Sequence, residues 1–167
     1  MSRHVLSVLV SNESGVLSRV AGLFSRRGFN IDSLSVGETE VPSISRMTIV
    51  AQGNEQVLDQ IEKQLNKLHD VLHIKIMPND DSVYRELLLI KVASSKETRA
   101  SIIEIADVFR AKIVDVASES LMIEITGDQS KINAFINLLD IYGIKEFTRT
   151  GLSALERGNE VIKDYLL

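Results

Sequence analysis

The feature that most constrains this chain is an order of apolar patterns that occurs twice. Each copy reads as strand, helix, strand, strand, helix and strand. Short β-branched runs such as His4 to Val10 indicate strands, and apolar residues that recur every three or four positions, as in residues 16–24, indicate helices. The pairs Gly53-Asn54 and Gly127-Asp128 stand before the second helix of each copy. The sequence therefore predicts an internal repeat of two units.

This order predicts both the fold class and the domain boundaries. With right-handed crossovers it gives a four-stranded antiparallel sheet that carries both helices on one face. We expect an α+β protein of two ferredoxin-like modules: residues 1–77, a polar linker at 78–83, and residues 84–167 with a C-terminal tail. The first strand of each module carries apolar residues on both faces, whereas a solvated face should be polar. We therefore expect a second subunit to cover the face without helices.

Composition excludes several classes of function. The 167 residues are 44% hydrophobic and 25% charged, which is typical of a folded protein. The net charge of −4, and the absence of aromatic residues in the strands predicted at 4–10 and 44–52, argue against a nucleic-acid-binding module. The chain has no cysteine and no apolar run of about 18 residues, so we expect neither disulfides nor a membrane span. A cytoplasmic protein is expected.

No pattern of catalytic residues is found. The chain contains no phosphate-binding loop, no dinucleotide-binding glycine motif and no nucleophile elbow. His69 and His73 are spaced as a metal-binding pair, but the spacing spans the end of a helix and the start of a strand, where the rings would not share a face. We expect neither a catalytic site nor a metal site.

Two segments of the first module offer groups suited to a free amino acid. Gly15 precedes a helix whose unpaired N–H groups suit a carboxylate, and it has no Cβ to keep a ligand away. Asn12 and Asn30 each carry a donor and an acceptor, and Ile31 or Val36 could bound a short apolar side chain. The same residues also fit a structural role, in which Asn12 and Gly15 make the turn into the helix and Asn30 follows its C-terminal cap.

The stretch from Ser7 to Leu34 closely resembles the opening of the small subunit of acetohydroxyacid synthase (acetolactate synthase), a family of ACT-domain proteins. The resemblance continues over five further segments and covers nearly the whole chain. These segments are Ser45–Ile49, Gln60–Leu68, Arg85–Leu87, Phe109–Val116 and Thr150–Gly158.

The resemblance implies a non-catalytic, regulatory subunit. Such a subunit binds the catalytic (large) subunit, raises its activity and confers feedback inhibition by valine or a related branched-chain amino acid. The catalytic subunit is expected to carry thiamin diphosphate, Mg and FAD, and this chain no cofactor. In similar ACT domains the effector lies between two paired modules, which implies a homodimer or a higher oligomer.

The effector-binding residues are carried over position by position. The resemblance assigns Asn12, Gly15, Asn30 and Ile31, and Gly37 stands where the family often has a small residue such as alanine. Val36 completes the set of six.

The second module departs from this pattern. Residues 94–97 contain no Asn-x-x-Gly, and Lys112-Ile113 replaces Asn30-Ile31, so we expect this module to serve assembly or communication. Candidate contacts are Phe109-Arg110 and the tail from Leu152 to Gly158, although Phe109 also fits packing within the module. Two alternatives stay open: a stand-alone ACT-type amino-acid sensor that acts on another enzyme, and a small ferredoxin-like enzyme with a site that these motifs do not reveal.

Overall fold

The computed structural model describes residues 2–166, apart from the side chain of Tyr165. The chain divides into two compact units, one made of Met1–Val83 with Leu152–Leu167 and the other of Tyr84–Gly151. The chain therefore passes between the units twice. The order of apolar patterns predicts that the tail belongs to the second module, whereas in the structure residues from Leu152 onward belong with the first.

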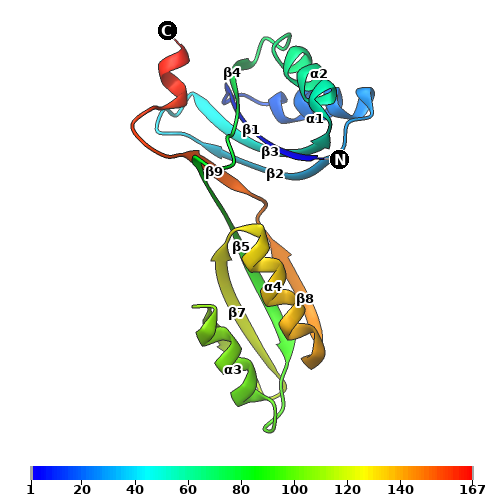
Figure 1. The fold of residues 1–167 in the computed structure, drawn as a ribbon, viewed down its shortest axis with the longest axis vertical. Coiled ribbons are helices and arrows are strands. Elements are labelled where there is room, and N and C mark those ends of the chain that lie inside the picture. Colours follow the sequence, from blue (N-terminus) through cyan, green and yellow to red (C-terminus); the bar gives the residue numbers. More distant parts are fainter. Residues whose placement is uncertain (1, 167) are drawn as a thin grey trace. The chain divides into compact units, whose positions relative to one another are not determined.

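The first unit has the predicted β-α-β-β-α-β order. Its sheet has the strand order β2-β3-β1-β4, and all neighbouring strands are antiparallel. Both helices lie on one face of the sheet (Figure 1). The elements are β1 (Ser2–Ser11), α1 (Val16–Arg27), β2 (Ile31–Glu38), β3 (Ile44–Gly53), α2 (Glu55–Leu65) and β4 (Val71–Ile76).

Local chemistry sets the ends of the two helices. Helix α1 is preceded by Gly15 and followed by Gly28, both in the left-handed region that glycine tolerates best, with φ of 84° and 70°. Helix α2 starts after Asn54, whose side chain accepts a hydrogen bond of 3.0 Å from the Val57 N–H. Each of these residues stands where the sequence pattern placed a helix boundary.

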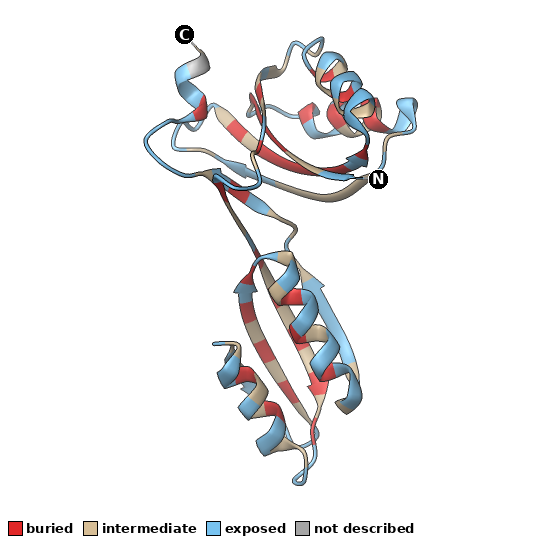
Figure 2. Ribbon diagram, viewed as in Figure 1, coloured by how far each residue is buried: buried red, intermediate tan, exposed pale blue. Residues whose placement is uncertain are grey.

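The core of the first unit lies between the sheet and the two helices, where buried residues are drawn in red in Figure 2. Alternate strand residues face the helices, as the two-residue period of a strand requires. The fully buried members are Leu6, Val8, Val10, Val20, Phe24, Met47, Ile49, Ala51, Ile61 and Leu65.

The other face of this sheet is also buried. Leu9 and Val50 point away from the helices, yet only 2% and 1% of their surface is exposed. The C-terminal tail lies on this face. Its strand β9 (Ser153–Glu156) pairs with β5 (Ser82–Ala93), its Glu156 forms an ion pair with Lys75 on β4, and its short 3-10 helix η2 (Ile162–Leu166) lies against β4. The sequence analysis expected a second subunit to cover the face. In the structure the chain's own tail lies there, 75 or more residues beyond β4, a distance that strand periodicity does not address.

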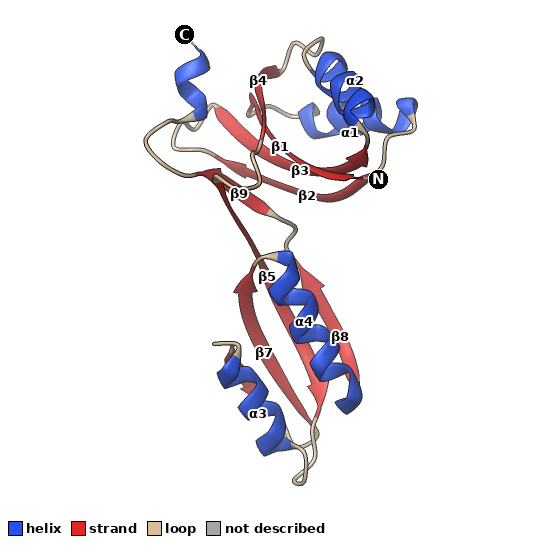
Figure 3. Ribbon diagram, viewed as in Figure 1, coloured by secondary structure: helices blue, strands red, loops and turns tan. Residues whose placement is uncertain are grey.

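The second unit repeats the same topology. Its strand order is β6-β7-β5-β8, again antiparallel, with both helices on one face (Figure 3). The α+β fold of two ferredoxin-like modules is thus confirmed. The elements are β5 (Ser82–Ala93), α3 (Arg99–Val108), β6 (Lys112–Val116), β7 (Ser120–Gly127), α4 (Gln129–Leu139), the 3-10 helix η1 (Asp140–Tyr142) and β8 (Ile144–Arg149).

The helices are short. The four α-helices have 10 to 12 residues. Within residues 2–166 no helix is long and apolar enough to cross a membrane.

Phe109 packs in the core of the second unit, with its ring centre 5.3 Å from that of Phe135, so the packing role proposed for it is the one observed.

Candidate effector-binding site

The N-terminus of α1 lacks the side-chain cap that two other helices have. Asn54 caps α2 and Asp128 caps α4, each by accepting a hydrogen bond from the backbone of the first turn. Gly15 caps α1 without a side chain, and the first turn contains no acidic residue. The N–H groups at the start of α1 therefore lack an internal side-chain acceptor. Such a helix end attracts an anionic group.

A guanidinium group lies beside this helix end. A Cβ built on Gly15 would come within 3.1 Å of Nη1 of Arg19, so the two residues adjoin. The Nε of Arg19 donates a hydrogen bond of 2.6 Å to the Asp70 carboxylate, which fixes the side chain. A ligand carboxylate at the start of α1 would thus meet both backbone N–H groups and a cation. The sequence analysis missed Arg19, although its spacing of four residues from Gly15 places both on one side of the helix.

Asn12 joins the loop before α1 to the turn between β2 and β3. Its backbone N–H donates to the Ser43 carbonyl at 2.8 Å, and its side-chain Nδ2 donates to the Pro42 carbonyl at 2.8 Å. The same Nδ2 lies 3.4 Å from Oε2 of Glu38, which is exposed at the end of β2. Asn12 therefore holds its loop to the turn between β2 and β3, which differs from the role in the turn into α1 considered above, and its side chain also lies near a carboxylate. Glu38, which the sequence analysis also missed, is suited to an ammonium group.

Val36 and Gly37 lie at this same end of β2. Gly37 pairs with Arg46 on β3, close to the pairing of Glu38 with Ser45. No atom lies within 4 Å of a Cβ built on Gly37, so packing within this chain does not require a glycine there. Val36 is 46% exposed, which is unusual for a valine in a strand next to the core. These two residues line an open surface.

Asn30 and Ile31 lie at the opposite end of β2. Asn30 Nδ2 donates a hydrogen bond of 2.7 Å to Asp32, which also accepts one from Gln52. Ile31 packs against the core. Six positions separate Ile31 from Gly37, which is about 20 Å at a rise of about 3.3 Å per residue. One chain therefore brings Asn12, Gly15, Val36 and Gly37 to one end of β2, but leaves Asn30 and Ile31 at the other.

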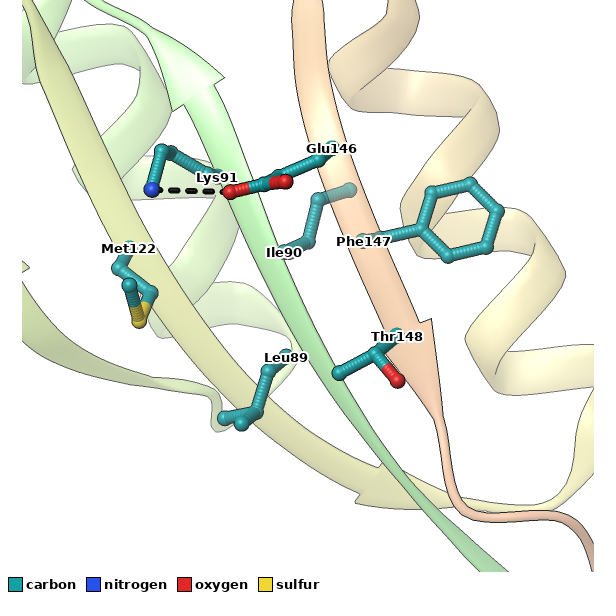
Figure 4. A pocket seen from close by; sticks show the side chains of 7 residues that line it. All are labelled: Leu89, Ile90, Lys91, Met122, Glu146, Phe147 and Thr148. Atoms are coloured by element: carbon teal, nitrogen blue, oxygen red, sulfur yellow. Dashed lines mark hydrogen bonds and ion pairs between the residues drawn. The ribbon is translucent and has the colours of Figure 1, made fainter.

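A hollow lies on the helix-free face of the second unit. It measures about 280 Å³ and is lined by Leu89, Lys91 and Met122 together with Glu146 and Thr148 (Figure 4). The Lys91 Nζ and a Glu146 carboxylate oxygen lie 3.0 Å apart and close an ion pair across β5 and β8. The hollow is largely apolar, so it suits a zwitterionic amino acid less well than the N-terminus of α1 does.

Among residues 2–166, apart from the Tyr165 side chain, no group of three or more His, Cys, Asp or Glu residues is placed to hold a metal ion. The N-terminus of α1 is the strongest candidate site, because it has no side-chain cap and lies near the charges of Arg19 and Glu38.

Comparison with known proteins decides the family. Residues 6–73 match the family model described as the AHAS small subunit-like ACT domain, and residues 85–158 match the one described as the small subunit of acetolactate synthase. This chain belongs to the acetolactate synthase small subunit family. The first model spans all six predicted effector-binding residues, and the second extends into the tail.

Individual members of the family are similar to this protein along nearly the whole chain. A probable acetolactate synthase small subunit from Archaeoglobus fulgidus is 52% identical over 158 residues, which are 95% of this chain and 99% of that protein. The acetolactate synthase small subunit of Mycolicibacterium smegmatis is 53% identical over 93% of this chain and 91% of its own. A crystal structure of the Thermotoga maritima small subunit matches with a TM-score of 0.89 and 44% identity, over 96% of this chain and all of that one. The resemblance read from the sequence is thus confirmed.

Proposed function

We propose that this chain is the regulatory subunit of an acetolactate synthase, which binds the catalytic subunit, raises its activity and makes that activity sensitive to valine or a related branched-chain amino acid. The observation that carries the proposal is the open N-terminus of α1, flanked by Arg19 and Glu38, in a chain that matches both family models. A free amino acid is a zwitterion. Its carboxylate suits the α1 end and Arg19, and its ammonium group suits Glu38.

Pairing of two chains completes the site. Strand β2 is an edge strand, so one side of its backbone is free to face another chain. When two copies meet through this edge with two-fold symmetry, the strands run antiparallel, and the start of one β2 lies beside the end of the other. Asn30 and Ile31 of one chain then approach the Gly15 loop of its partner. The roughly 20 Å gap within one chain is bridged in the dimer, which forms two equivalent sites.

The apolar part of the ligand fits the same interface. The exposed Val36 lies near one end of β2 and the partly buried Ile31 at the other, so each chain contributes one of them to a site. A valine side chain between them is removed from water without a polar partner, which favours a short branched aliphatic chain over a polar one.

The catalytic subunit and this chain have different roles in the proposed holoenzyme. In this proposal thiamin diphosphate, Mg and FAD belong to the catalytic subunit, and this chain contributes binding and a change of conformation. The alternative of a stand-alone sensor for another enzyme would leave unexplained why residues 85–158 match the small-subunit model in addition to the ACT domain.

The test is a calorimetric titration of the full chain with valine, leucine and isoleucine, with D-valine as a control for chirality, combined with assays of the reconstituted holoenzyme. We expect saturable binding of an L-branched-chain amino acid with one site per chain, activation of the catalytic subunit, and inhibition by the same amino acid. Failure of the chain to bind the purified catalytic subunit would overturn the proposal.

A further inference from the structure

The tail leaves the second unit at a fixed point. Thr150 makes two hydrogen bonds with Leu87. Its backbone N–H donates to the Leu87 carbonyl at 3.1 Å, and its Oγ1 accepts from the Leu87 N–H at 3.0 Å. Gly151 follows with a φ of 86°, and Leu152 is already part of the first unit. Leu152 is therefore the first residue of the tail that the first unit holds.

Two serines of β2 hold the backbone of Leu152. The Leu152 N–H donates to Ser33 Oγ at 3.0 Å, and the Leu152 carbonyl accepts from Ser35 Oγ at 3.1 Å. Ser35 Oγ also lies 3.5 Å from Ser153 Oγ. Both serines alternate with Leu34, which faces the core, so they stand on the opposite face of the strand. We call this group of Ser33, Ser35 and the Leu152 backbone the serine clamp.

The serine clamp lies in the middle of the strand that carries the candidate effector residues. Asn30 and Ile31 precede it, and Val36 and Gly37 follow it. Strand β2 pairs with β3 alone, and the register of that pairing shifts between Ile31 and Ser33. An edge strand with an irregularity at one end is held by fewer ladder bonds than a central strand and is the part of the sheet most able to shift.

The rest of the tail is attached in two different ways. Its first part is tight: Ala154 is buried, and Glu156 forms an ion pair with Lys75 on β4. Its second part is held by the buried Ile162 of η2, beside a cavity of about 310 Å³ between residues 155–163 and the sheet, and the ion pair of Lys163 with Glu40 at 3.3 Å is exposed. The attachment of the tail to the first unit thus begins at the serine clamp, where β2 and the tail are directly hydrogen-bonded.

We propose that the serine clamp is the coupling element of the regulatory response, which carries effector occupancy at β2 into the chain segment that joins the two units. This inference rests on the proposed function. In the proposed dimer each β2 contacts one effector near its start and another near its end. Occupancy of these sites biases the position of Ser33 and Ser35, and the Leu152 backbone follows because both of its polar groups are bonded to them. The bistable element is β2 with the first residues of the tail.

The test separates binding from transmission. The double variant Ser33→Ala/Ser35→Ala removes both hydroxyl groups from the helix-free face and leaves the six effector positions unchanged, and Ser101→Ala at an exposed site of α3 is the matched control. We expect valine affinity, measured by calorimetry on the full chain, to stay within about twofold, while the valine concentration that inhibits the holoenzyme rises at least about fivefold, the lower bound of typical allosteric coupling. Ser33→Thr/Ser35→Thr keeps both hydroxyl groups and should restore inhibition.

Hydrogen exchange on the full chain gives an independent readout. Valine should change the exchange of the Leu152 amide and the β9 amides in the wild type, and no longer in the Ala variant. An Ala variant that is inhibited like the wild type, or one that loses valine binding altogether, would overturn the clamp as coupling element. A wild-type chain that binds no branched-chain amino acid would overturn the proposed function, and the inference with it. Circular dichroism checks that each variant is folded.

Discussion

Arg46 on β3 donates a hydrogen bond of 3.0 Å from Nη1 to the Oγ of Ser7 on β1, on the sheet face that the tail covers. Ser7 is fully buried, and burial lowers the pKa of Arg46 from its usual value, although the nearby Glu40 opposes this. A charged group held against a buried hydroxyl marks this face as an interior surface. The tail is therefore part of the folded structure of the first unit, with consequences for stability.

Removal of one tail side chain should destabilise the first unit only. Ile162 is 7% exposed in η2, so Ile162→Ala leaves a cavity and should lower the free energy of unfolding by about 2 kcal/mol, at the low end for such substitutions near a surface. The chain has no tryptophan, so unfolding is followed by circular dichroism, with hydrogen exchange to separate the units. Val161→Ala, at a neighbouring exposed site, is the control. Equal destabilisation of both units would contradict the assignment of the tail.

A carboxylate at the start of α1 should compete with the effector. Asp tolerates the left-handed conformation better than most residues, so Gly15→Asp should fold, with its side chain beside Arg19 and the open N–H groups. We expect valine binding to weaken at least tenfold, about 1.4 kcal/mol, through steric exclusion and charge repulsion. Gly143→Asp, at another positive φ in the second unit, controls for backbone strain. Undiminished valine binding in a folded Gly15→Asp chain would rule out this site.

The edge of β2 should control both dimerisation and effector binding. Val36→Glu places a charge on the exposed edge surface, where the proposed pairing sets it against apolar surface of the partner with no opposite charge beside it. We expect the variant to sediment as a monomer at concentrations where the wild type is a dimer, and to lose most of its valine affinity, because binding and association are linked by mass action. Val108→Glu on α3, which is exposed in the second unit, should change neither. A wild-type monomer that binds valine would refute the interface.

The cap of α2 should contribute measurably to stability. Asn54→Ala removes the acceptor for the Val57 N–H and should lower the free energy of unfolding by about 1 kcal/mol. Asn66→Ala, at the exposed C-terminal end of the same helix, serves as the control for loss of an asparagine side chain. Denaturant titration of both variants measures the difference, and equal stabilities would show that the cap is replaced by water at no cost.

His73 should make stability depend on pH below neutrality. Burial lowers its pKa below the usual 6.5, as does the charge of Lys75, while Glu62 opposes them. The unfolded chain therefore binds the proton more readily, so this contribution to stability is complete above pH 6.5 and is lost as the pH falls toward the lowered pKa. We expect the free energy of unfolding of His73→Gln to decline less steeply than that of the wild type between pH 7 and about 5, where carboxylates are still ionised. Parallel unfolding curves of both proteins across this range would contradict the assignment.

Much of the fold was predictable because it depends on local chemistry. Helix ends at Gly15, Gly28 and Asn54 follow from backbone conformation and capping, which involve residues within one turn. The repeat follows from apolar periodicity, and each copy folds to the same strand order. The departure of the second module from the Asn-x-x-Gly pattern is likewise visible in the sequence alone.

The candidate site was only partly predictable. Sequence placed Asn12 and Gly15 in one loop, but Glu38 came near them only through the register of β2 with β3, and Arg19 through the side-chain direction on α1. Asn30 and Ile31 are separated from the Gly15 loop by the length and direction of β2. The apolar pattern predicts the length of the strand, but residue types do not encode its direction in the sheet. The proposed division of the site between two chains rests on that geometry.

By itself, the sequence determined the two modules, their helix boundaries and the family, because these depend on periodicity and on contacts between near neighbours. Only the tertiary structure decided where the tail belongs. The hydrogen bond between Leu152 and Ser33 spans 119 positions, and serine hydroxyl groups bond equally well to many partners. Which partner they meet depends on how the whole chain packs, and that information is absent from any local pattern.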